Sequence, residues 1–349
     1  MGVNRSTWLI ARALWLALLV VVLVFFGLNF VFRVLDEIKG PHSQYLFTDA
    51  LLVSLTGMPR RLYLDLPLMV LIAVAAGLGG LAQSSELTAL RAAGLSVGRI
   101  FTKALLALSP VLVGALVVAE VGMPQAEQFS QAYRDSKTTG TPPSVIWTRE
   151  DGQFLKLTGR PSGELANWVS VELYEDRNEI RTVIEANTVQ WMPEGVQLTD
   201  ATSLMFGSER IVSETATLEA PTALDAEQVR WLVQTPEALA LSDLWAASEF
   251  LSNEGLNARA HSQLFWQRML LPVTLVVLAM LASATAFGSL RSLSLSSRVF
   301  LAVLLGLVFK YAMDMASPAV FLAGWHPAFA IVLPLLIPLA LMPRLLRAR

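Results

Sequence analysis

The chain has 349 residues, of which 54% are hydrophobic, and it contains no cysteine. So apolar a composition indicates a membrane protein with several spans rather than an ordinary soluble domain. The absence of cysteine excludes disulfide bonds and thiolate metal sites within the chain. The formal net charge of −2 conceals an uneven distribution, because residues 123–257 hold 9 Lys+Arg and 21 Asp+Glu whereas the remainder holds 17 and 7. An acidic, water-soluble block therefore separates two basic, apolar parts.

Each apolar part contains three segments with the length and hydropathy of bilayer-spanning helices. They cover residues 14–32, 62–81, 105–121, 270–287, 299–316 and 328–341. We therefore predict an α+β membrane protein with six transmembrane helices, three before and three after a soluble domain. The predicted domains are residues 1–122 with the first three helices, 123–257 as the soluble domain, and 258–349 with the last three helices.

The lysines and arginines of the short loops predict the orientation, since such residues concentrate on the cytoplasmic side of a membrane protein. They lie before the first helix, between the second and third, between the fourth and fifth, and at the end of the chain. With six spans these four places share one side, the cytoplasm. The loop at 317–327, on the opposite side, has neither residue. The soluble domain is therefore predicted to be extracytoplasmic.

A short amphipathic helix is predicted at about residues 84–94, between the second and third spans. It has a serine that can cap its N-terminus, charges that suit the two ends of the helix dipole, and a glycine that can stop it. These residues are Ser84 or Ser85, Glu86, Arg91 and Gly94. Leu87 and Leu90 form one apolar face. These residues alone leave two interpretations open, an interfacial loop helix or a contact for a partner.

From residue 141 onward the pattern changes to the alternation and the β-branched and aromatic enrichment typical of strands. The predicted strands cover residues 153–158, 168–174, 182–191 and 196–204. Turns rich in Gly, Pro and Asn separate them, and many short strands with such turns predict a sandwich or jellyroll. Residues 242–253 then predict an amphipathic helix that leads toward the fourth span.

No motif in the chain indicates an enzyme. Residues 94–98, GLSVG, match the pattern around a nucleophilic serine, here Ser96, but that motif requires a strand–turn–helix context. No G-x-x-x-x-G-K-[ST] sequence is present, so we do not expect this chain to bind ATP. The histidines, His42, His261 and His326, are far apart and have no metal-ligand spacing. We expect no catalytic residue, no cofactor, no metal and no nucleic-acid partner.

Three charged residues lie in or near predicted spans, where charge is costly and often functional. Lys310 and Asp314 are four residues apart, so they can neutralise each other as an ion pair on one face of a helix. Glu120 lies at the outer end of the third span. An ion pair is the simpler interpretation of Lys310 and Asp314, and a functional role is the alternative.

Five stretches together resemble the LptF/LptG family, the permeases of the lipopolysaccharide exporter. They are FRVLDEIK at 32–39, SELTALRAAG at 85–94, MPQAEQFSQAYR at 123–134, FGSLRS at 287–292, and the end of the fifth span from Asp314 to Pro318. Their order and spacing cover nearly the whole chain, and the first and fourth stretches favour the LptG branch over LptF. Lys310 departs from the apolar or aromatic residue that the family pattern implies.

The resemblance implies a periplasmic β-jellyroll and a place in the inner membrane of a Gram-negative bacterium. It implies a permease subunit of an ABC transporter that extracts lipopolysaccharide and passes it to a periplasmic bridge. The implied partners are an LptF-like permease, an LptB-like ATPase dimer that uses ATP, and an LptC-like subunit. The helix at 84–94 would then be the coupling helix, with four residues toward the ATPase: Glu86, Leu87, Leu90 and Arg91. The competing interpretation is a non-transporting scaffold whose outer domain binds envelope proteins.

The loop between the first two spans departs from the positive-inside rule, because four cations lie on its predicted outer side. They are Arg33, Lys39, Arg60 and Arg61, and Arg134 beyond the third span adds another. Local pairs, Arg33 with Glu37 and Lys39 with Asp36, are one interpretation, but these pairs leave Arg60 and Arg61 unexplained.

Phosphates on a glycolipid explain the whole group of cations, because Arg offers a bidentate fork and Lys a point charge. We therefore predict that Arg33 and Lys39 bind substrate phosphates, with Arg60 and Arg134 as further contacts. Phe26 and Phe30, one turn apart, are candidates to line a cavity for acyl chains, and lipid-facing or packing roles are the alternatives.

Overall fold

The computed structural model describes residues 5–39, 46–137, 144–150, 153–159, 168–176, 180–192, 195–206, 211–220, 226–287 and 294–347. The chain forms two compact units. The helical unit comprises Met1–Leu35, Met58–Met123 and Asn257–Arg349, and the sheet unit comprises Asp36–Gly57 and Pro124–Leu256. The segment 36–57 thus groups with the sheet unit, although it precedes the second predicted span.

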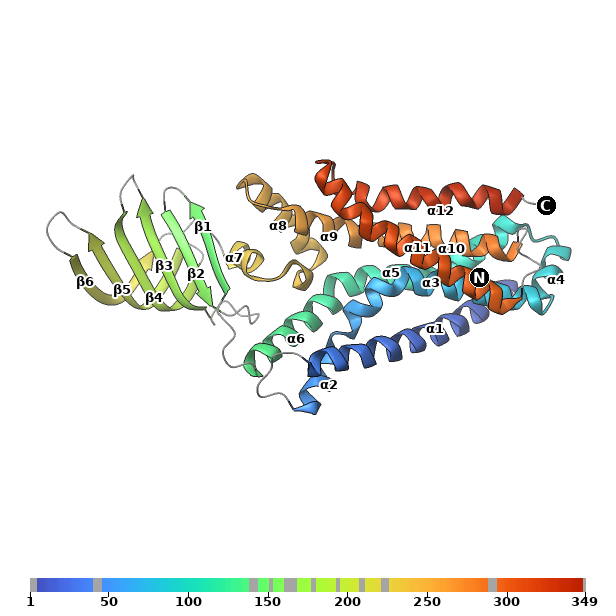
Figure 1. Cartoon of the computed structure of the whole chain (residues 1–349), viewed down its shortest axis with the longest axis horizontal. Helices are drawn as coiled ribbons and strands as arrows, with labels where there is room; N and C mark the ends of the chain where they lie inside the picture. Colours follow the sequence, from blue (N-terminus) through green and yellow to red (C-terminus); the bar gives the residue numbers. More distant parts are fainter. Residues whose placement is uncertain are drawn as a thin grey trace. The chain divides into compact units, whose positions relative to one another are not determined.

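Long helices make up the helical unit, and most of them extend along a common direction (Figure 1). They are α1 (Arg5–Ile38), α3 (Met58–Gln83), α5 (Val97–Val117), α9 (Arg259–Met269), α10 (Leu271–Phe287), α11 (Leu295–Leu322) and α12 (Phe329–Arg347), with the short α4 (Glu86–Ala92) after α3. A π-helical turn, η1 (Val118–Gly122), joins α5 to α6 (Met123–Lys137). Pro59 lies in the first turn of α3, where its missing N–H leaves no helix hydrogen bond unmade.

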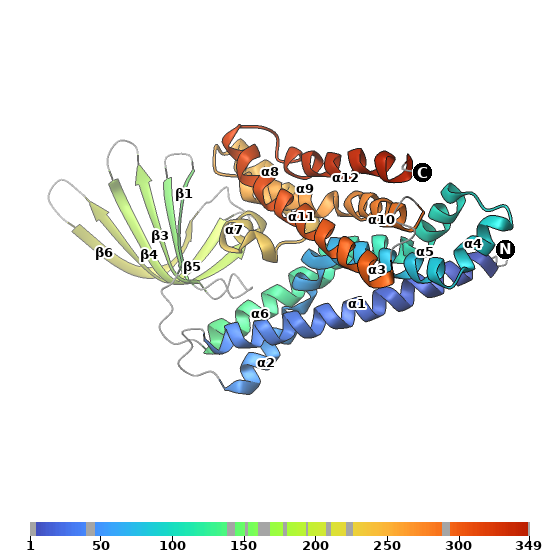
Figure 2. The ribbon, with the colours of Figure 1, turned by 45° about the vertical axis from the view of Figure 1, so that its right-hand side comes forward.

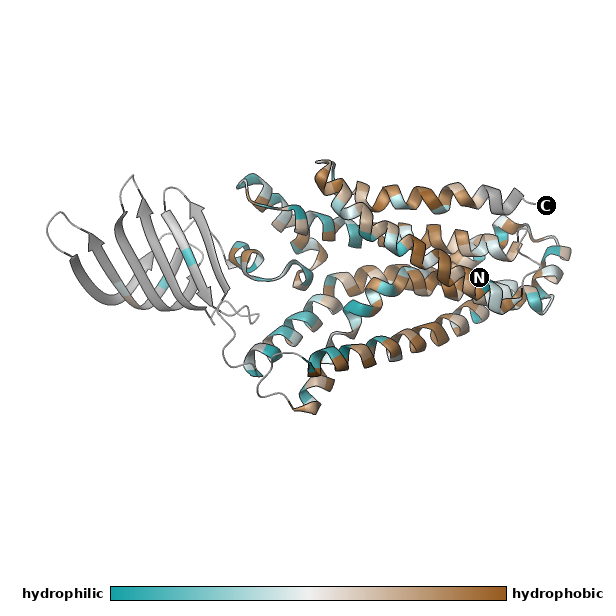
Figure 3. Ribbon diagram, in the orientation of Figure 1, coloured by the Kyte–Doolittle hydropathy of each residue, from teal (hydrophilic) through white to brown (hydrophobic). Residues whose placement is uncertain are grey.

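Among the described residues, four helices are long and apolar enough to cross a membrane. Hydrophobic residues also extend along other helices of the helical unit (Figure 3). The four helices are Arg5–Ile38, Met58–Gln83, Val97–Arg134 and Leu295–Leu322. A fifth results if α9 and α10, bent by 48°, form one span. The predicted arrangement of six spans is therefore not confirmed. The reason is length, because α10 has 17 residues and the apolar part of α12 is shorter still, whereas a bilayer requires about 20.

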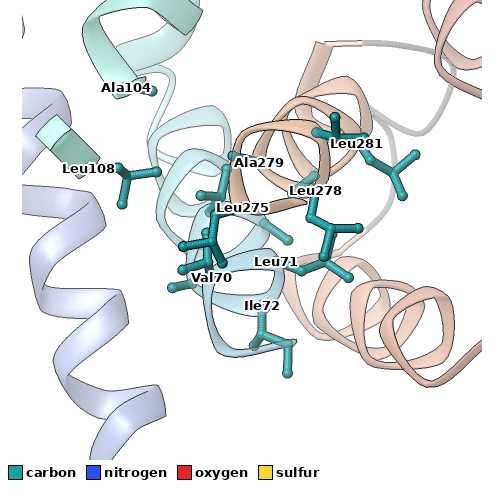
Figure 4. Packing of buried hydrophobic residues seen from close by; sticks show 14 of the residues in the cluster. Val70, Leu71, Ile72, Ala104, Leu108, Leu275, Leu278, Ala279 and Leu281 are labelled. Atoms are coloured by element: carbon teal, nitrogen blue, oxygen red, sulfur yellow. The ribbon is translucent and has the colours of Figure 1, made fainter. Parts of the chain in front are cut away.

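The core of the helical unit lies around α10, most of whose side chains are buried. Leu275 and Leu278 of α10 pack with Val70 and Leu71 of α3 (Figure 4). Small residues allow a close approach elsewhere, because a Cβ at Gly77 of α3 would lie 3.1 Å from the carbonyl oxygen of Ala13 in α1. The helical unit is thus held by aliphatic packing and close backbone approach.

The sheet unit contains one curved six-stranded antiparallel sheet (Figure 2). Its strands are β1 (Ser144–Glu150), β2 (Gln153–Gly159), β3 (Trp168–Asp176), β4 (Ile180–Met192), β5 (Gly195–Phe206) and β6 (Ile211–Ala220). The four predicted strands correspond to β2 to β5, and the sequence analysis missed β1 and β6.

Each strand of the described sheet pairs with the next one in the chain, for example Leu155 opposite Leu173 and Ile184 opposite Ser203. A jellyroll would instead bring non-consecutive strands together through Greek keys. The jellyroll connectivity is therefore not confirmed. Alternation and turn residues predict individual strands, whereas they do not predict which strands pair.

Short helices complete the sheet unit: α2 (Phe47–Thr56), α7 (Ala226–Val233), η3 (Pro236–Ala238) and α8 (Leu241–Asn253). The side chain of Gln131 on α6 donates to Thr235 Oγ1 at 3.0 Å, just before η3. Arg230 of α7 forms an ion pair with Asp243 of α8 at 3.0 Å. The helix predicted at 242–253 is α8, which begins one residue earlier, at Leu241.

Candidate functional site

The helical unit contains a cavity of about 350 Å³ between α1, α3, α10 and α11. Much of its wall is apolar, with Phe25, Leu28 and Phe32 from α1, Leu64 from α3, and Phe309 and Met313 from α11. Such a lining suits hydrocarbon chains. The predicted pair Phe26 and Phe30 stack on each other, with ring centroids 5.9 Å apart, and neither belongs to the lining. The cavity therefore lies against a different face of α1 from the one expected.

Four charged side chains line the same cavity, two from each of two helices. Arg61 and Asp65 come from α3, and Lys310 and Asp314 come from α11. Asn29 of α1 donates through Nδ2 to Asp65 Oδ2 at 2.9 Å and to the Phe25 carbonyl at 3.0 Å. Asp65 is therefore held in place by a neutral partner.

The predicted ion pair between Lys310 and Asp314 is absent, since no carboxylate oxygen lies within 4.0 Å of the Lys310 ammonium in the described part of the chain. The spacing of four residues places both on one side of α11. However, the short Asp side chain follows the Lys in the chain, and this order is the less favourable one for such pairs. Both side chains instead line the cavity. A functional role for these two residues stays a prediction.

Two of the cations predicted to bind phosphate belong to the helical unit. Arg33 lies half-buried near the end of α1, and Arg60 lies half-buried in the first turn of α3. Both take part in an interaction within the protein, and neither belongs to the cavity lining of the described residues. The sequence analysis selected Arg60, whereas its neighbour Arg61 is the residue that lines the cavity. One position around a helix is about 100°, and the sequence gave no means to choose between the two.

The other two predicted cations belong to the sheet unit. Lys39 is exposed just after α1. Arg134 of α6 makes a bidentate contact with Glu37, from Nε to Oε1 at 2.9 Å and from Nη2 to Oε2 at 3.2 Å. Glu37 is only 8% exposed, so this pair holds the end of α1 to α6. Arg134 therefore has a structural role that the sequence analysis did not foresee, because the two residues are 97 positions apart.

Asp49 of α2 is a second buried carboxylate in the sheet unit. It accepts hydrogen bonds from the Tyr133 hydroxyl at 2.6 Å and from the Leu46 backbone N–H at 2.9 Å, and the Lys137 ammonium lies 3.9 Å away. These contacts, that of Tyr133 above all, hold the pKa of Asp49 below its ordinary value. The same hydrogen bond raises the pKa of Tyr133. The pair fastens α2 to α6.

The predicted helix at 84–94 is α4, which ends before Gly94 in the left-handed conformation, with φ +88°. Ser85 precedes α4 but makes no side-chain cap, and it is itself left-handed with φ 65°. Leu87 is 4% exposed and belongs to the core of the helical unit, and Leu90 packs against it. Leu87 is thus largely covered by the chain's own core, Leu90 stays partly exposed, and the role of this face toward a partner stays a prediction. Glu86 and Arg91 are exposed and remain available to a partner.

Ser96, the serine of the GLSVG motif, caps α5 by accepting a hydrogen bond from the Arg99 backbone N–H at 3.4 Å. The motif therefore lies at the start of a helix after a turn, without the preceding strand that a nucleophile elbow requires. His42 lies outside the described residues.

The sequence matches a known family over most of its length. Residues 8–348 match the family model described as lipopolysaccharide export system permease LptF/LptG. The chain is 22% identical over 334 residues to the lipopolysaccharide export system permease protein LptG of Escherichia coli strain K12, which covers 93% of each chain. It is 20% identical over 344 residues to the protein of that name from Haemophilus influenzae strain Rd, which covers 96% of each chain.

Proposed function

We propose, since the chain belongs to the lipopolysaccharide export system permease family LptF/LptG, that it is the LptG-type subunit of an ABC transporter for lipopolysaccharide. This subunit extracts the lipid from the inner membrane and passes it to a periplasmic bridge toward the outer membrane. The observation that carries the proposal is the cavity among apolar helices, which combines a hydrocarbon-like wall with Arg61 and Lys310. An amphiphile with acyl chains and phosphates fits that combination.

The orientation follows from the charge distribution of the sequence. By the positive-inside rule, the basic loops support an orientation with both termini and α4 in the cytoplasm and the acidic sheet unit in the periplasm. The curved sheet would then receive the acyl chains in the manner of a jellyroll with an apolar slot. A reporter fused after Gln190 is expected to behave as periplasmic, and one fused after Gly94 as cytoplasmic; the reverse result contradicts the orientation.

The ATPase acts on this subunit from the cytoplasmic side in this proposal, because the chain has no phosphate-binding loop of its own. The partners are an LptB-like ATPase dimer, an LptF-like permease and an LptC-like subunit. Glu86 and Arg91 are the exposed charges of α4, and an ion pair with the ATPase at a partly buried interface contributes about 1.5–3 kcal/mol.

Glu86→Lys is therefore expected to uncouple ATP hydrolysis from lipid transport. Glu254→Lys is the matched control, because Glu254 is an equally exposed glutamate that follows α8 in the sheet unit. Lipid-stimulated hydrolysis is measured with the assembled complex. Unchanged stimulation in Glu86→Lys would remove α4 from the coupling interface.

Arg33 and Lys39 are proposed as phosphate contacts near the outer end of α1. Replacing both by Glu is expected to reduce photocrosslinking to lipopolysaccharide while the complex stays assembled. Arg134 is set apart from them, because its guanidinium is already engaged by Glu37. Undiminished crosslinking in an assembled complex would mean that Arg33 and Lys39 do not bind substrate phosphates and have a purely structural role.

The transport function is tested by photocrosslinking from two methionines on the same helix. Met313 lines the cavity, whereas Met315 is 73% exposed and lies outside the lining. A photoreactive amino acid at position 313 is expected to give a lipopolysaccharide adduct that increases before ATP is added and falls during turnover. The same amino acid at position 315 is expected to give little adduct. Equal adducts at both positions would favour the scaffold alternative, in which the chain moves no lipid.

A further inference from the structure

The four charges of the cavity occur in the same order on both helices. Each helix carries a cation followed four residues later by a carboxylate, Arg61 and Asp65 on α3, and Lys310 and Asp314 on α11. Residues four apart lie about one turn apart on one side of a helix, so each helix presents a cation and an acid at two successive levels.

Two contacts fix how α3 and α11 run past each other. Arg298 Nη1 of α11 donates to the Gly79 carbonyl oxygen of α3 at 3.3 Å. Further along α11, a Cβ at Gly306 would meet the Leu68 side chain of α3. Residue numbers therefore increase along α11 in the direction in which they decrease along α3. The two helices are antiparallel, as their ends in Figure 1 also show.

The antiparallel register places opposite charges at the same level. One turn beyond the contact of Gly306 with Leu68, Lys310 reaches the level of Asp65. One turn further, Asp314 reaches the level of Arg61. A parallel pair of helices with the same sequences would place cation beside cation and acid beside acid. The observed register instead makes the two walls of the cavity complementary.

None of these opposite charges is paired across the cavity in the structure. The described residues contain no ion pair within 4.0 Å that involves Arg61, Asp65, Lys310 or Asp314. In a wet, open cavity the attraction between such charges is weak. It strengthens several-fold when the walls approach and water leaves, because the effective dielectric constant falls. The array is therefore suited to respond to cavity closure.

We propose that Arg61 with Asp314, and Lys310 with Asp65, form a charge clasp that closes across the cavity when it is empty and collapsed. A lipid with phosphate groups keeps the clasp open, because its phosphates bind Arg61 and Lys310 in competition with the two carboxylates. The clasp thereby selects phosphorylated amphiphiles and prevents return of the lipid after its expulsion. It rests on the proposed transport function, since it regulates the same cavity.

The clasp is tested by distance-dependent crosslinking of the assembled complex, in which each introduced pair supplies the only thiols of this chain. Leu64→Cys with Met313→Cys places one thiol on each cavity wall. Ile72→Cys with Ala302→Cys is the control pair in the packed part of the same two helices, where both residues are buried. Crosslinking is compared between the lipid-free, vanadate-trapped complex and the complex loaded with lipid A or with dephosphorylated lipid A.

In the trapped complex, Asp314→Arg is expected to lower crosslinking of the cavity pair about fivefold, a shift that a small change in free energy produces. Adding Arg61→Asp to Asp314→Arg is expected to restore crosslinking of the cavity pair. Crosslinking of the control pair is expected to be the same in all variants. Lipid A is expected to lower crosslinking of the cavity pair more than its dephosphorylated form. Equal crosslinking in the parent and in Asp314→Arg, or no restoration by the double reversal, would overturn the clasp.

These outcomes separate the clasp from the transport proposal. If the charge reversals behave as expected but lipid A has no effect, the pairing of the four charges on closure stands, whereas the competition by lipid phosphates and the assigned substrate are wrong. If position 313 crosslinks to lipopolysaccharide but the reversals change nothing, the transport proposal stands and the clasp is wrong.

Discussion

The carboxylates of the sheet unit and those that line the cavity of the helical unit differ in their polar partners. In the sheet unit, Glu37 and Asp49 are 8% and 5% exposed, and each has a strong polar partner from α6. In the cavity, Asp65 has only the neutral amide of Asn29, and Asp314 has no ion pair within 4.0 Å among the described residues. Charges that stabilise the fold are paired across elements, whereas the cavity charges are left for a ligand or another conformation.

The pairing also distinguishes cations that the sequence placed in one group. Arg134 and Arg61 were both outer cations in the sequence analysis, yet Arg134 forms a bidentate ion pair and Arg61 lines the cavity. A fixed ion pair positions helices, and a cation in an amphiphilic cavity binds anions. The substitutions below test that distinction by comparing their effects on stability.

The largest expected effect is that of Arg134→Met. It removes the bidentate partner of a buried carboxylate, and we expect the free energy of unfolding of the sheet unit to fall by about 2 kcal/mol. Thermal unfolding of the purified protein in detergent measures the change. Lys137→Met is the matched control on the same helix, because its ammonium lies 3.9 Å from Asp49 and its side chain is 39% exposed. We expect less than about 0.5 kcal/mol from the control, and equal losses in the two variants would contradict the assignment.

A smaller, pH-dependent effect is expected from Tyr133→Phe, which removes the hydroxyl that donates to Asp49. The pKa of Asp49 is lowered in the fold, so its stabilising contribution is present above pH 3.8 and is lost as the pH falls through the folded value. The pKa of Tyr133 is raised, so its contribution is present below pH 10 and is lost as the pH rises through the folded value. The two effects define a window between these values in which the hydrogen bond stabilises the fold.

The stability difference between the parent and Tyr133→Phe is therefore expected to be constant from pH 5 to 9. It is expected to narrow below pH 3.8 and above pH 10. Unfolding curves collected across this range check the prediction. A difference that widens in acid would show that Asp49 is held by groups other than Tyr133.

Much of the fold could be predicted from the sequence because periodicity and composition are local. The helices that correspond to α1, α3, α5 and α11, and the strands β2 to β5, follow from apolar length and alternation. The end of α4 follows from Gly94 for the same reason. The burial of Leu87 could not be predicted in this way, because an apolar helix face can contact either a partner or the chain's own core. Only the packing of the folded chain distinguishes the two.

The candidate site was less predictable because it depends on long-range contacts. The pair of Glu37 with Arg134 and the register of α3 against α11 join residues that are far apart in the sequence. Lys310 and Asp314 were visible as charges in a span, but a spacing of four residues predicted an ion pair within the helix. The companion charges on α3, Arg61 and Asp65, have the same spacing, and this repetition was the signal that could have indicated a shared cavity.

The smallest expected effect on stability is that of Lys310→Met, and it is the sharpest test of the contrast. Because the Lys310 ammonium has no ion pair within the described part of the chain, removing it deprives none of the described carboxylates of a partner. We therefore expect the unfolding free energy to change by less than about 0.5 kcal/mol in the open protein, far less than in Arg134→Met. Asp314→Asn is expected to behave alike, since both residues line the cavity without an ion pair. The vanadate-trapped complex is expected to differ, because the clasp is closed there and the substitution removes one of its pairs. A loss of stability in the open protein as large as that of Arg134→Met would mean that Lys310 is already paired, and the division between structural and cavity charges would fail at that residue.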